Sequence, residues 1–279
     1  MKIGLGLPNT LADLQAQELW EWARLADQGP FSSAAVLDRV AYDSYDPLIT
    51  LAALAAITRR VRLASMVIIG PLRNTTLLGK AASSLQAVSE GRFTLGIALG
   101  ARLDDYEATK ISFAGRGARL NQQLAELRDQ WEGGQIGPTT AERPELIVGG
   151  LTDSTFGRVA RYADGYMHNG GPAPIFSRMA DKARSAWRDA GRPGAPRLVG
   201  MAYYTLGDDA IVEAGREYLR EYYAFTGLFA ERIAQGLLTT PQSIAAFVRS
   251  YADLGCDELI LFPTSRETSQ AEQLVQVVG

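Results

Sequence analysis

The sequence predicts a single (β/α)8 barrel that spans residues 1–279. Eight short apolar stretches with strand character alternate with stretches whose apolar residues recur at helical spacing, and this alternation is typical of a parallel sheet. The length fits a barrel, which usually needs about 250 residues. No shift in composition marks a linker. The alternative is an open, doubly wound sheet. It is disfavoured because the segment GIALGA (96–101) lacks the third glycine of a dinucleotide-binding fingerprint.

The expected strands are short apolar runs. Residues 66–69 and 259–262 are apolar at every position, as expected for strands that are covered on both faces. In chain order, the expected strands are residues 3–7, 34–38, 61–70, 93–99, 145–150, 164–169, 197–206 and 257–262.

The expected helices are bounded by recognisable start and stop signals. An Asp-Pro pair at 46–47 precedes one helix and two arginines at 59–60 close it, while glycines at 91, 133–134 and 191 stop others. The expected helices are residues 14–28, 46–60, 74–91, 116–131, 153–162, 176–190, 208–235 with a break near Gly227, 241–254, and a last one from Glu267.

Composition excludes several classes of function. The net charge of −3 and the lack of a basic stripe argue against nucleic-acid binding. One cysteine, Cys256, and one histidine, His168, exclude an intrachain disulfide and a His/Cys metal cluster. The N-terminus lacks a signal peptide, and the longest near-apolar run (47–57) is too short to cross a bilayer. We therefore expect a cytoplasmic protein with no metal, which acts on a small molecule.

Glycines follow three neighbouring strands, at the end of a barrel where active sites lie. Gly100 ends the fourth strand, Gly149 and Gly150 the fifth, and Gly170 and Gly171 follow the sixth. Glycine allows positive φ and the close approach of a ligand. Hydroxyl residues at 152, 154 and 155 come next at a helix start, where free N–H groups attract phosphate. The alternative is that Asp153 or Ser154 only caps the helix.

Two ionisable residues also stand at strand ends. His168 is placed where a general base or a hydrogen-bond donor to a cofactor is needed, and the alternative is a half-buried structural histidine. Asp38 closes an apolar strand, where an unpaired carboxylate is costly. It is expected to pair with Arg39 or another cation at the barrel mouth, in a structural or a catalytic role.

Five segments of the chain together resemble the luciferase-like monooxygenase superfamily, which also contains deazaflavin-dependent oxidoreductases. The most specific is LLGKAASSLQAVSEGRFTLGIALGARLDDYEA (77–108), a helix, an S-x-G-R element, a strand and its glycine-bearing end. The others are DPLITLAALAAITRRVRLAS (46–65), RPELIVGG (143–150), RVARYADGYMHN (158–169) and TPQSIAAFVRSYADLGCDELILF (240–262).

The resemblance implies an oxidoreductase that binds a reduced flavin (FMN) or deazaflavin (coenzyme F420) at the carboxyl end of the barrel. It places Gly149, Gly150 and Thr152 at the cofactor phosphate, with Asn169, Gly170 and Gly171 nearby. Ile68, Ile69 and Gly70 would lie behind the isoalloxazine ring, in a strand bulge where members often have a non-proline cis bond. Leu99 and Gly100 would flank the ring on its other side, and Asp38, Arg39 and His168 would shape the substrate side.

The chain departs from the family at two positions that handle protons. Many members have a histidine where this chain has Arg39, and the acidic residue that some deazaflavin enzymes carry just beyond the fourth strand is not evident, since Asp104 and Asp105 lie farther along the expected loop. Resemblance to compact members favours the deazaflavin over FMN.

Two partners also follow from the resemblance. One is a second copy of the chain, bound through the second and third helices. These helices contain Leu51, Leu54, Leu77 and Leu78, and the alternative is that these leucines serve only the wall of the barrel. The other is a separate reductase that supplies reduced cofactor. Two other functions remain open: an aldolase, isomerase or hydrolase that acts on a phosphorylated substrate, and a non-catalytic flavin-binding protein.

Overall fold

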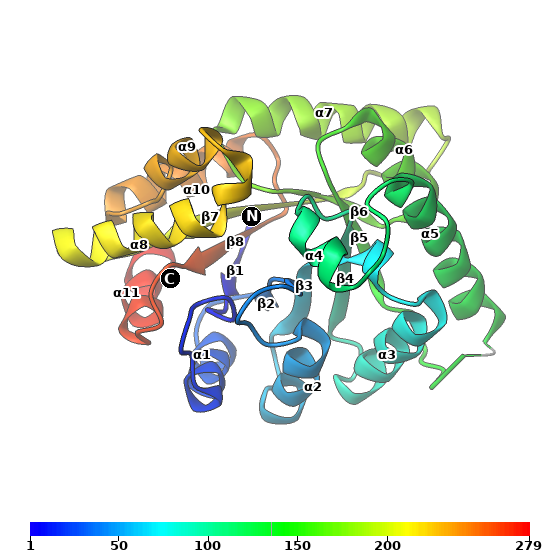
Figure 1. Cartoon of the computed structure of the whole chain (residues 1–279), viewed down its shortest axis with the longest axis horizontal. Coiled ribbons are helices and arrows are strands. Elements are labelled where there is room, and N and C mark those ends of the chain that lie inside the picture. The colour runs from blue at the N-terminus through cyan, green and yellow to red at the C-terminus, as the bar shows by residue number, and fades with distance from the viewer. Residues whose placement is uncertain (135) are drawn as a thin grey trace.

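The computed structural model describes residues 1–134 and 136–279. Its strands form one closed parallel barrel in chain order, and the helices surround it (Figure 1). The first strand pairs with both the second and the last, which closes the sheet. The predicted barrel is confirmed, and the open sheet is excluded.

The strands begin and end close to the predicted positions. They are β1 (Lys2–Gly6), β2 (Ser33–Val36), β3 (Arg62–Ile69), β4 (Phe93–Ala98), β5 (Glu145–Gly149), β6 (Gly165–His168), β7 (Arg197–Tyr204) and β8 (Glu258–Pro263). The helices are α1 (Ala16–Gln28), α2 (Pro47–Ile57), α3 (Thr75–Val88), α4 (Leu103–Ala108), α5 (Arg116–Gly133), α6 (Asp153–Tyr162), α7 (Ala173–Asp189), α8 (Asp209–Tyr222), α9 (Phe229–Gln235), α10 (Pro241–Asp253) and α11 (Ser269–Val278), with 3-10 turns at Gly70–Leu72 and Ala224–Thr226.

The predicted break in helix 208–235 is confirmed: α8 and α9 are separate helices, and Gly227 between them adopts a φ of 61°. One other helical segment differs from the prediction. The sequence pattern predicts a loop after β4, whereas the structure has helix α4 there. It is short and polar, so it has too few apolar positions for a helical period to be recognised.

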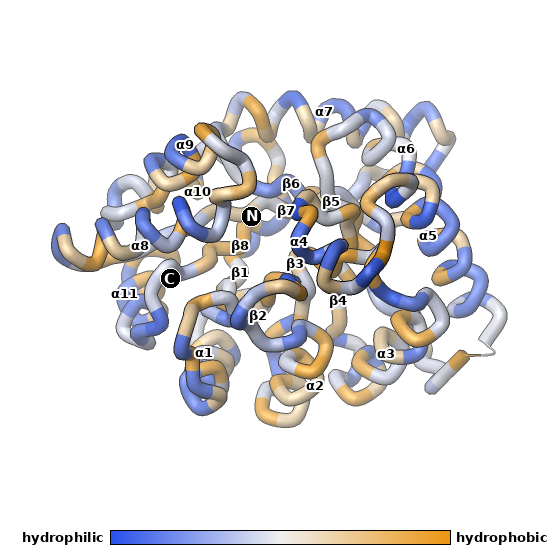
Figure 2. Tube along the Cα trace, in the orientation of Figure 1, coloured by the Kyte–Doolittle hydropathy of each residue, from blue (hydrophilic) through white to orange (hydrophobic). Residues whose placement is uncertain are grey.

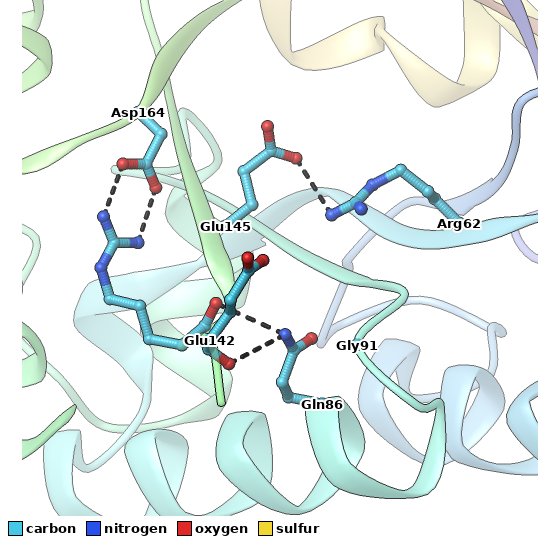
Figure 3. Close-up of a pocket in the computed structure, with 7 residues that line it drawn as sticks. Arg62, Gln86, Gly91, Glu142, Glu145 and Asp164 are labelled. Atoms are coloured by element: carbon cyan, nitrogen blue, oxygen red, sulfur yellow. Dashed lines mark hydrogen bonds and ion pairs between the residues drawn. The ribbon is translucent and has the colours of Figure 1, made fainter. Parts of the chain in front are cut away.

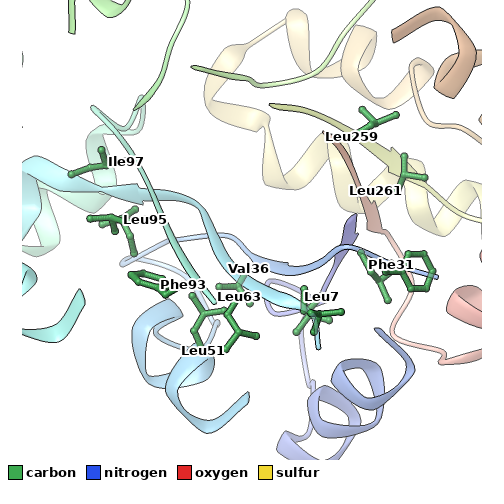
Figure 4. Close-up of a cluster of buried hydrophobic side chains, with 14 of the residues drawn as sticks. Leu7, Phe31, Val36, Leu51, Leu63, Phe93, Leu95, Ile97, Leu259 and Leu261 are labelled. Carbon is green, nitrogen blue, oxygen red and sulfur yellow. The ribbon is translucent and has the colours of Figure 1, made fainter. Parts of the chain in front are cut away.

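Side chains of each strand alternate between two apolar layers. The outer layer lies between the strands and the helices, and Figure 4 shows Phe93 of β4, Leu63 of β3 and Leu51 of α2 together in it. The inner layer fills the barrel with the alternate residues, such as Ala64 and Met167. Most helices expose hydrophilic residues, whereas α2 is hydrophobic over most of its length (Figure 2).

Ion pairs cover the amino-terminal end of the barrel. Arg197 and Glu145 are partly buried there, whereas Glu258 is fully buried, and Arg197 donates hydrogen bonds to both carboxylates. The Thr94 hydroxyl donates to Glu145 (2.7 Å) and the Ser33 hydroxyl to Glu258 (2.8 Å). Each carboxylate therefore accepts from a guanidinium and a hydroxyl, which satisfies its oxygens at this end. In the described part of the chain, no helix is long and apolar enough to cross a membrane.

Candidate functional site

Glycines with positive φ shape the carboxyl ends of β4, β5 and β6. Their φ angles are 70° at Gly100, 140° at Gly150, 89° at Gly170 and 110° at Gly171. A Cβ atom at Gly150 would lie 2.5 Å from Oγ1 of Thr155. These turns therefore require glycine, and they leave bare backbone at the mouth of the barrel.

The turn between β5 and α6 presents an unused helix N-terminus. Thr152 is the N-cap of α6, and its side chain accepts no hydrogen bond from the helix backbone. Its Oγ1 lies 2.9 Å from Oγ of Ser154 and 3.3 Å from Oγ1 of Thr155 instead. The interpretation of Asp153 or Ser154 as a cap is wrong. The N–H of Thr155 donates to the Thr152 carbonyl (2.8 Å), and the Thr155 side chain is buried. The N–H groups of Asp153 and Ser154 and the exposed hydroxyls of Thr152 and Ser154 remain available to an anion.

Arg158 brings a buried positive charge to the same turn. It is 6% exposed. Its Nε donates to Asn121 Oδ1 (2.7 Å), its Nη1 to the Ser154 hydroxyl (3.4 Å) and its Nη2 to the Gly117 carbonyl (3.3 Å). Burial lowers the pKa of Arg158. No carboxylate of the described residues forms an ion pair with it, so an anion bound at the α6 N-terminus would compensate its charge.

Asp38 supports the backbone at the end of β3. Its Oδ2 accepts from the Ile69 N–H (2.9 Å) and its Oδ1 from Nη2 of Arg73 (3.1 Å). Burial raises the pKa of Asp38, and the Arg73 charge opposes this. The expected pairing with a cation at the mouth is confirmed. The partner is Arg73, which also contacts Asp46 (3.0 Å), and not the adjacent Arg39.

The expected bulge lies in β3. The pairing with β4 shifts register between Ser65 and Ile68, and the Met66–Val67 peptide bond is cis. The Ile68 side chain lies in the outer layer, and a Cβ atom at Gly70 would contact Gln123 and Ile97 there.

The residues of β3 that face the barrel interior are Ala64, Met66 and Val67. Because side chains alternate along a strand, an inward Ala64 predicts an inward Met66. Simple alternation would turn Val67 outward, so the register shift at the bulge makes its inward position unpredictable from the sequence. Ile69 contacts Gly100, where a Cβ atom would lie 2.6 Å from its Cγ2, so these two predicted residues are brought together.

The remaining predicted wall residues lie around the same turns. Gly149 faces inward, since a Cβ atom there would lie 3.5 to 3.8 Å from Val67, Ala98 and Met167. Leu99 packs against the outer layer, and Asn169 is exposed.

His168 points away from the mouth into the outer layer. It is 0% exposed, and its ring lies 5.7 Å from that of Phe176 on α7. Nδ1 lies 3.3 Å from the Tyr166 hydroxyl, which donates to the Gly150 carbonyl (3.0 Å). Burial lowers the pKa of His168 to about 4, so the ring is neutral. The structure does not bring His168 together with Asp38 and Arg39. It places His168 behind the glycine turn of β5.

Arg39 forms a buried ion pair at the mouth with a residue that sequence reasoning missed. Its Nε donates to Asp105 (3.1 Å), and its Nη2 lies 3.3 Å from Asp104. Asp105 is 0% exposed and also accepts from the N–H groups of Val40 (2.9 Å) and Ala41 (2.8 Å). The two aspartates lie on α4, and not in a loop as predicted. The segment 77–108, which resembles the family, shows where β4 begins and ends, but it carries no signal for this pairing.

A group of five tyrosines, which we call the tyrosine cluster, covers the inner layer at the mouth. The Tyr42 and Tyr222 rings meet edge to face at 5.5 Å, and the Tyr203 and Tyr223 hydroxyls lie 2.9 Å apart. Tyr218 packs beside Tyr222 (5.6 Å). Burial raises the pKa of the tyrosine hydroxyls, so they stay uncharged. The mouth is therefore aromatic, neutral and rich in hydroxyl groups.

Two other cavities are less suited to chemistry. One of about 400 Å³ lies at the amino-terminal end of the barrel (Figure 3) and is lined by Arg62, Gln86, Gly91, Glu142, Arg143, Glu145 and Asp164. Four of its charged side chains are already paired, Arg143 with Asp164 (2.6 Å) and Arg62 with Glu145 (3.3 Å). Another of about 430 Å³ lies between the loops that follow β1 and β2. The described residues include no group of three or more acidic, histidine or cysteine side chains that could hold a metal ion.

Known proteins share the fold and the sequence pattern over most of the chain. An uncharacterized protein of Mycobacterium tuberculosis is 28% identical over 61% of this chain and 71% of its own. An F420-dependent secondary alcohol dehydrogenase, solved with an F420–acetone adduct, has a TM-score of 0.86 at 15% identity and covers 99% of this chain and 98% of its own.

A second solved structure carries the other type of cofactor. The oxygenating part of 3,6-diketocamphane monooxygenase from Pseudomonas putida, in complex with FMN, has a TM-score of 0.73 at 15% identity and covers 100% of this chain and 97% of its own. The family model described as luciferase-like monooxygenase matches residues 1–274. The resemblance found in the sequence is confirmed: this chain belongs to the luciferase-like monooxygenase family.

Proposed function

We propose that this protein is an oxidoreductase that uses reduced coenzyme F420 or reduced FMN, bound at the carboxyl end of the barrel, to act on a small organic substrate. The observation that carries the proposal is the turn after β5. There, the unused N-terminus of α6, its hydroxyls and the buried charge of Arg158 converge. Both cofactors carry a phosphate that fits this donor set. The bound cofactor would supply a hydride, or activate oxygen in the case of reduced FMN.

The other residues of the mouth would position the cofactor ring. Asp38 and Arg73 hold the Ile69 backbone against Gly100. Met66 and Val67 give the interior an apolar wall. These contacts join the ends of β2, β3 and β4, so the cofactor ring would lie against a rigid surface. The packed inner layer of the barrel would keep water from reaching the ring through the barrel interior.

The decisive experiment compares FMN with riboflavin, which lacks the phosphate. We expect the wild-type protein to bind FMN at least tenfold more tightly, because a charge-assisted hydrogen bond to phosphate is worth about 1.5–3 kcal/mol. Arg158→Met should remove most of this preference. Arg161→Met, on the exposed side of the same helix, is the matched control and should retain it. Equal affinity of the wild-type protein for both flavins would refute the phosphate site.

A parallel titration with coenzyme F420 and reduced FMN tests the choice of cofactor. Resemblance to compact members supports F420, and tighter binding of F420 would direct the search to substrates that accept or donate a hydride. Tighter binding of reduced FMN, together with oxygen uptake, would instead support a monooxygenase and a separate reductase. Retention of inorganic phosphate alone would support the alternative of a phosphorylated substrate.

We also propose that the protein forms a homodimer through α2 and α3. Ile49 and Leu77, one on each helix, are 74% and 70% exposed, and α2 carries alanines rather than charges on the same outer face. Such apolar faces favour a partner surface. Ile49→Glu should give a monomer in sedimentation equilibrium, whereas a monomeric wild-type protein would refute the proposal.

A further inference from the structure

Arg39 has one nitrogen that the protein itself does not use. Its side chain is 3% exposed. The Nε and Nη2 atoms are taken by Asp105, Asp104 and the Ala41 carbonyl (3.2 Å). The remaining nitrogen, Nη1, is buried and has no hydrogen-bond partner among the described residues. A buried donor left without a partner is costly, so a ligand that brings a hydrogen-bond acceptor to Nη1 would be stabilised there.

The surroundings of this nitrogen define what it can bind. The guanidinium lies over the Tyr42 ring (4.6 Å to its centre) and near the Tyr222 ring (5.4 Å). Both rings belong to the tyrosine cluster, so a ligand at Nη1 would have an aromatic or apolar body.

The local charge is already balanced. Arg39 and Arg102 face Asp104 and Asp105, and Arg102 binds Asp104 at 2.8 Å. Two cations therefore meet two anions before any ligand is bound. A negatively charged ligand would leave this cluster with one excess negative charge in a poorly solvated place. An uncharged hydrogen-bond acceptor adds no charge, so it suits the vacant donor better.

We propose that Nη1 of Arg39 binds an uncharged oxygen of the substrate, of the carbonyl type, while the apolar or aromatic body of the substrate packs against the tyrosine cluster. The inference rests on the proposed function only in taking the barrel mouth as the place where the substrate reacts. A guanidinium donates hydrogen bonds without giving up a proton. Arg39 therefore fixes and polarises the oxygen, and it does not replace the proton transfer that a histidine at this position could perform.

Equilibrium dialysis with two probes of similar shape tests the proposal. Acetophenone has the carbonyl oxygen, and ethylbenzene lacks it. The measurement is made on the protein alone and with the cofactor that binds. We expect the wild-type protein to bind acetophenone about tenfold more tightly than ethylbenzene. The carbonyl stretching frequency of bound acetophenone should fall, since its oxygen accepts a strong hydrogen bond.

Two matched variants separate the oxygen contact from folding. Arg39→Lys keeps a cation against Asp105 but has a single terminal nitrogen, so the preference for acetophenone and the frequency shift should both disappear. Arg102→Lys changes an arginine of the same cluster whose Nη1 already donates to the Tyr222 carbonyl (2.6 Å), and it should retain both. Circular dichroism and thermal unfolding confirm that each variant is folded.

Each contrary result has a definite meaning. Equal affinity for the two probes, no saturable binding of either, or an unchanged preference in Arg39→Lys overturns the proposal. Tighter binding of benzoate than of acetophenone overturns the claim that the oxygen is uncharged. Failure of the FMN and riboflavin comparison, with the acetophenone preference intact, would refute the proposed cofactor site and leave this oxygen site standing.

Discussion

Replacing His168 with asparagine is expected to make the protein more resistant to mild acid. The imidazole is fully buried beside Phe176 and Tyr166, and burial lowers its pKa from the ordinary 6.5 to about 4. In the unfolded chain the same ring takes up a proton near pH 6.5. Between these two pKa values the unfolded state binds more protons than the folded state, so the free energy of unfolding falls as the pH falls.

The size of the effect follows from the two pKa values. The contribution is fully present above the unfolded pKa of 6.5 and declines steadily towards 4. At pH 5 the wild-type protein should have lost about 2 kcal/mol through this residue. His168 is the only histidine in the chain, so no other imidazole titrates in this window.

Urea unfolding of the wild-type protein and of His168→Asn, at pH 7.5 and at pH 5, measures this loss. Carboxylate titration affects both proteins alike, so the difference between their losses reports the histidine. His168→Phe, which suits the aromatic surroundings, is a second variant without a titrating group. The two imidazole resonances of this histidine in the proton NMR spectrum should move little between pH 8 and pH 5. A midpoint near 6.5, or equal losses in the wild-type and variant proteins, would refute the buried, neutral histidine.

Three further predictions concern the Arg39 ion pair, the glycine turn after β5 and the single cysteine. Asp105→Asn should lower the free energy of unfolding in urea by about 3–5 kcal/mol, because it removes the buried carboxylate that pairs with Arg39 and leaves that guanidinium only the exposed Asp104. Asp104→Asn, whose side chain is 43% exposed, should cost under about 1 kcal/mol. Gly150→Ala should weaken FMN binding at least tenfold, because its Cβ atom would clash with the α6 hydroxyl. Gly191→Ala, where a Cβ atom meets nothing within 4 Å, should leave FMN binding unchanged and cost about 1–2 kcal/mol of stability through its φ of 67°. Cys256 should react with a thiol reagent only after unfolding, since burial raises its pKa to about 12; rapid labelling of the native protein would contradict this.

The sequence alone determined the barrel, its strand order and the glycine turns. These features depend on local chemistry: the period of apolar residues sets helix or strand, and a φ such as the 140° of Gly150 is accessible mainly to glycine. The family blocks added the bulge in β3 and the likeness to flavin and deazaflavin enzymes. The residues that bind the cofactor remain predictions, which the phosphate comparison tests.

The direction in which each ionisable side chain points was decided only by the tertiary structure. His168 stands at a strand end, as predicted, but strand alternation turns its ring outward to Phe176. Arg39 finds its partner in Asp105, 66 positions away on a helix too short and polar to be predicted. The tyrosine cluster likewise gathers side chains from β7, from α8 and from the loop after β2. Such pairings depend on how distant segments close over the barrel, and no periodicity within a segment records them.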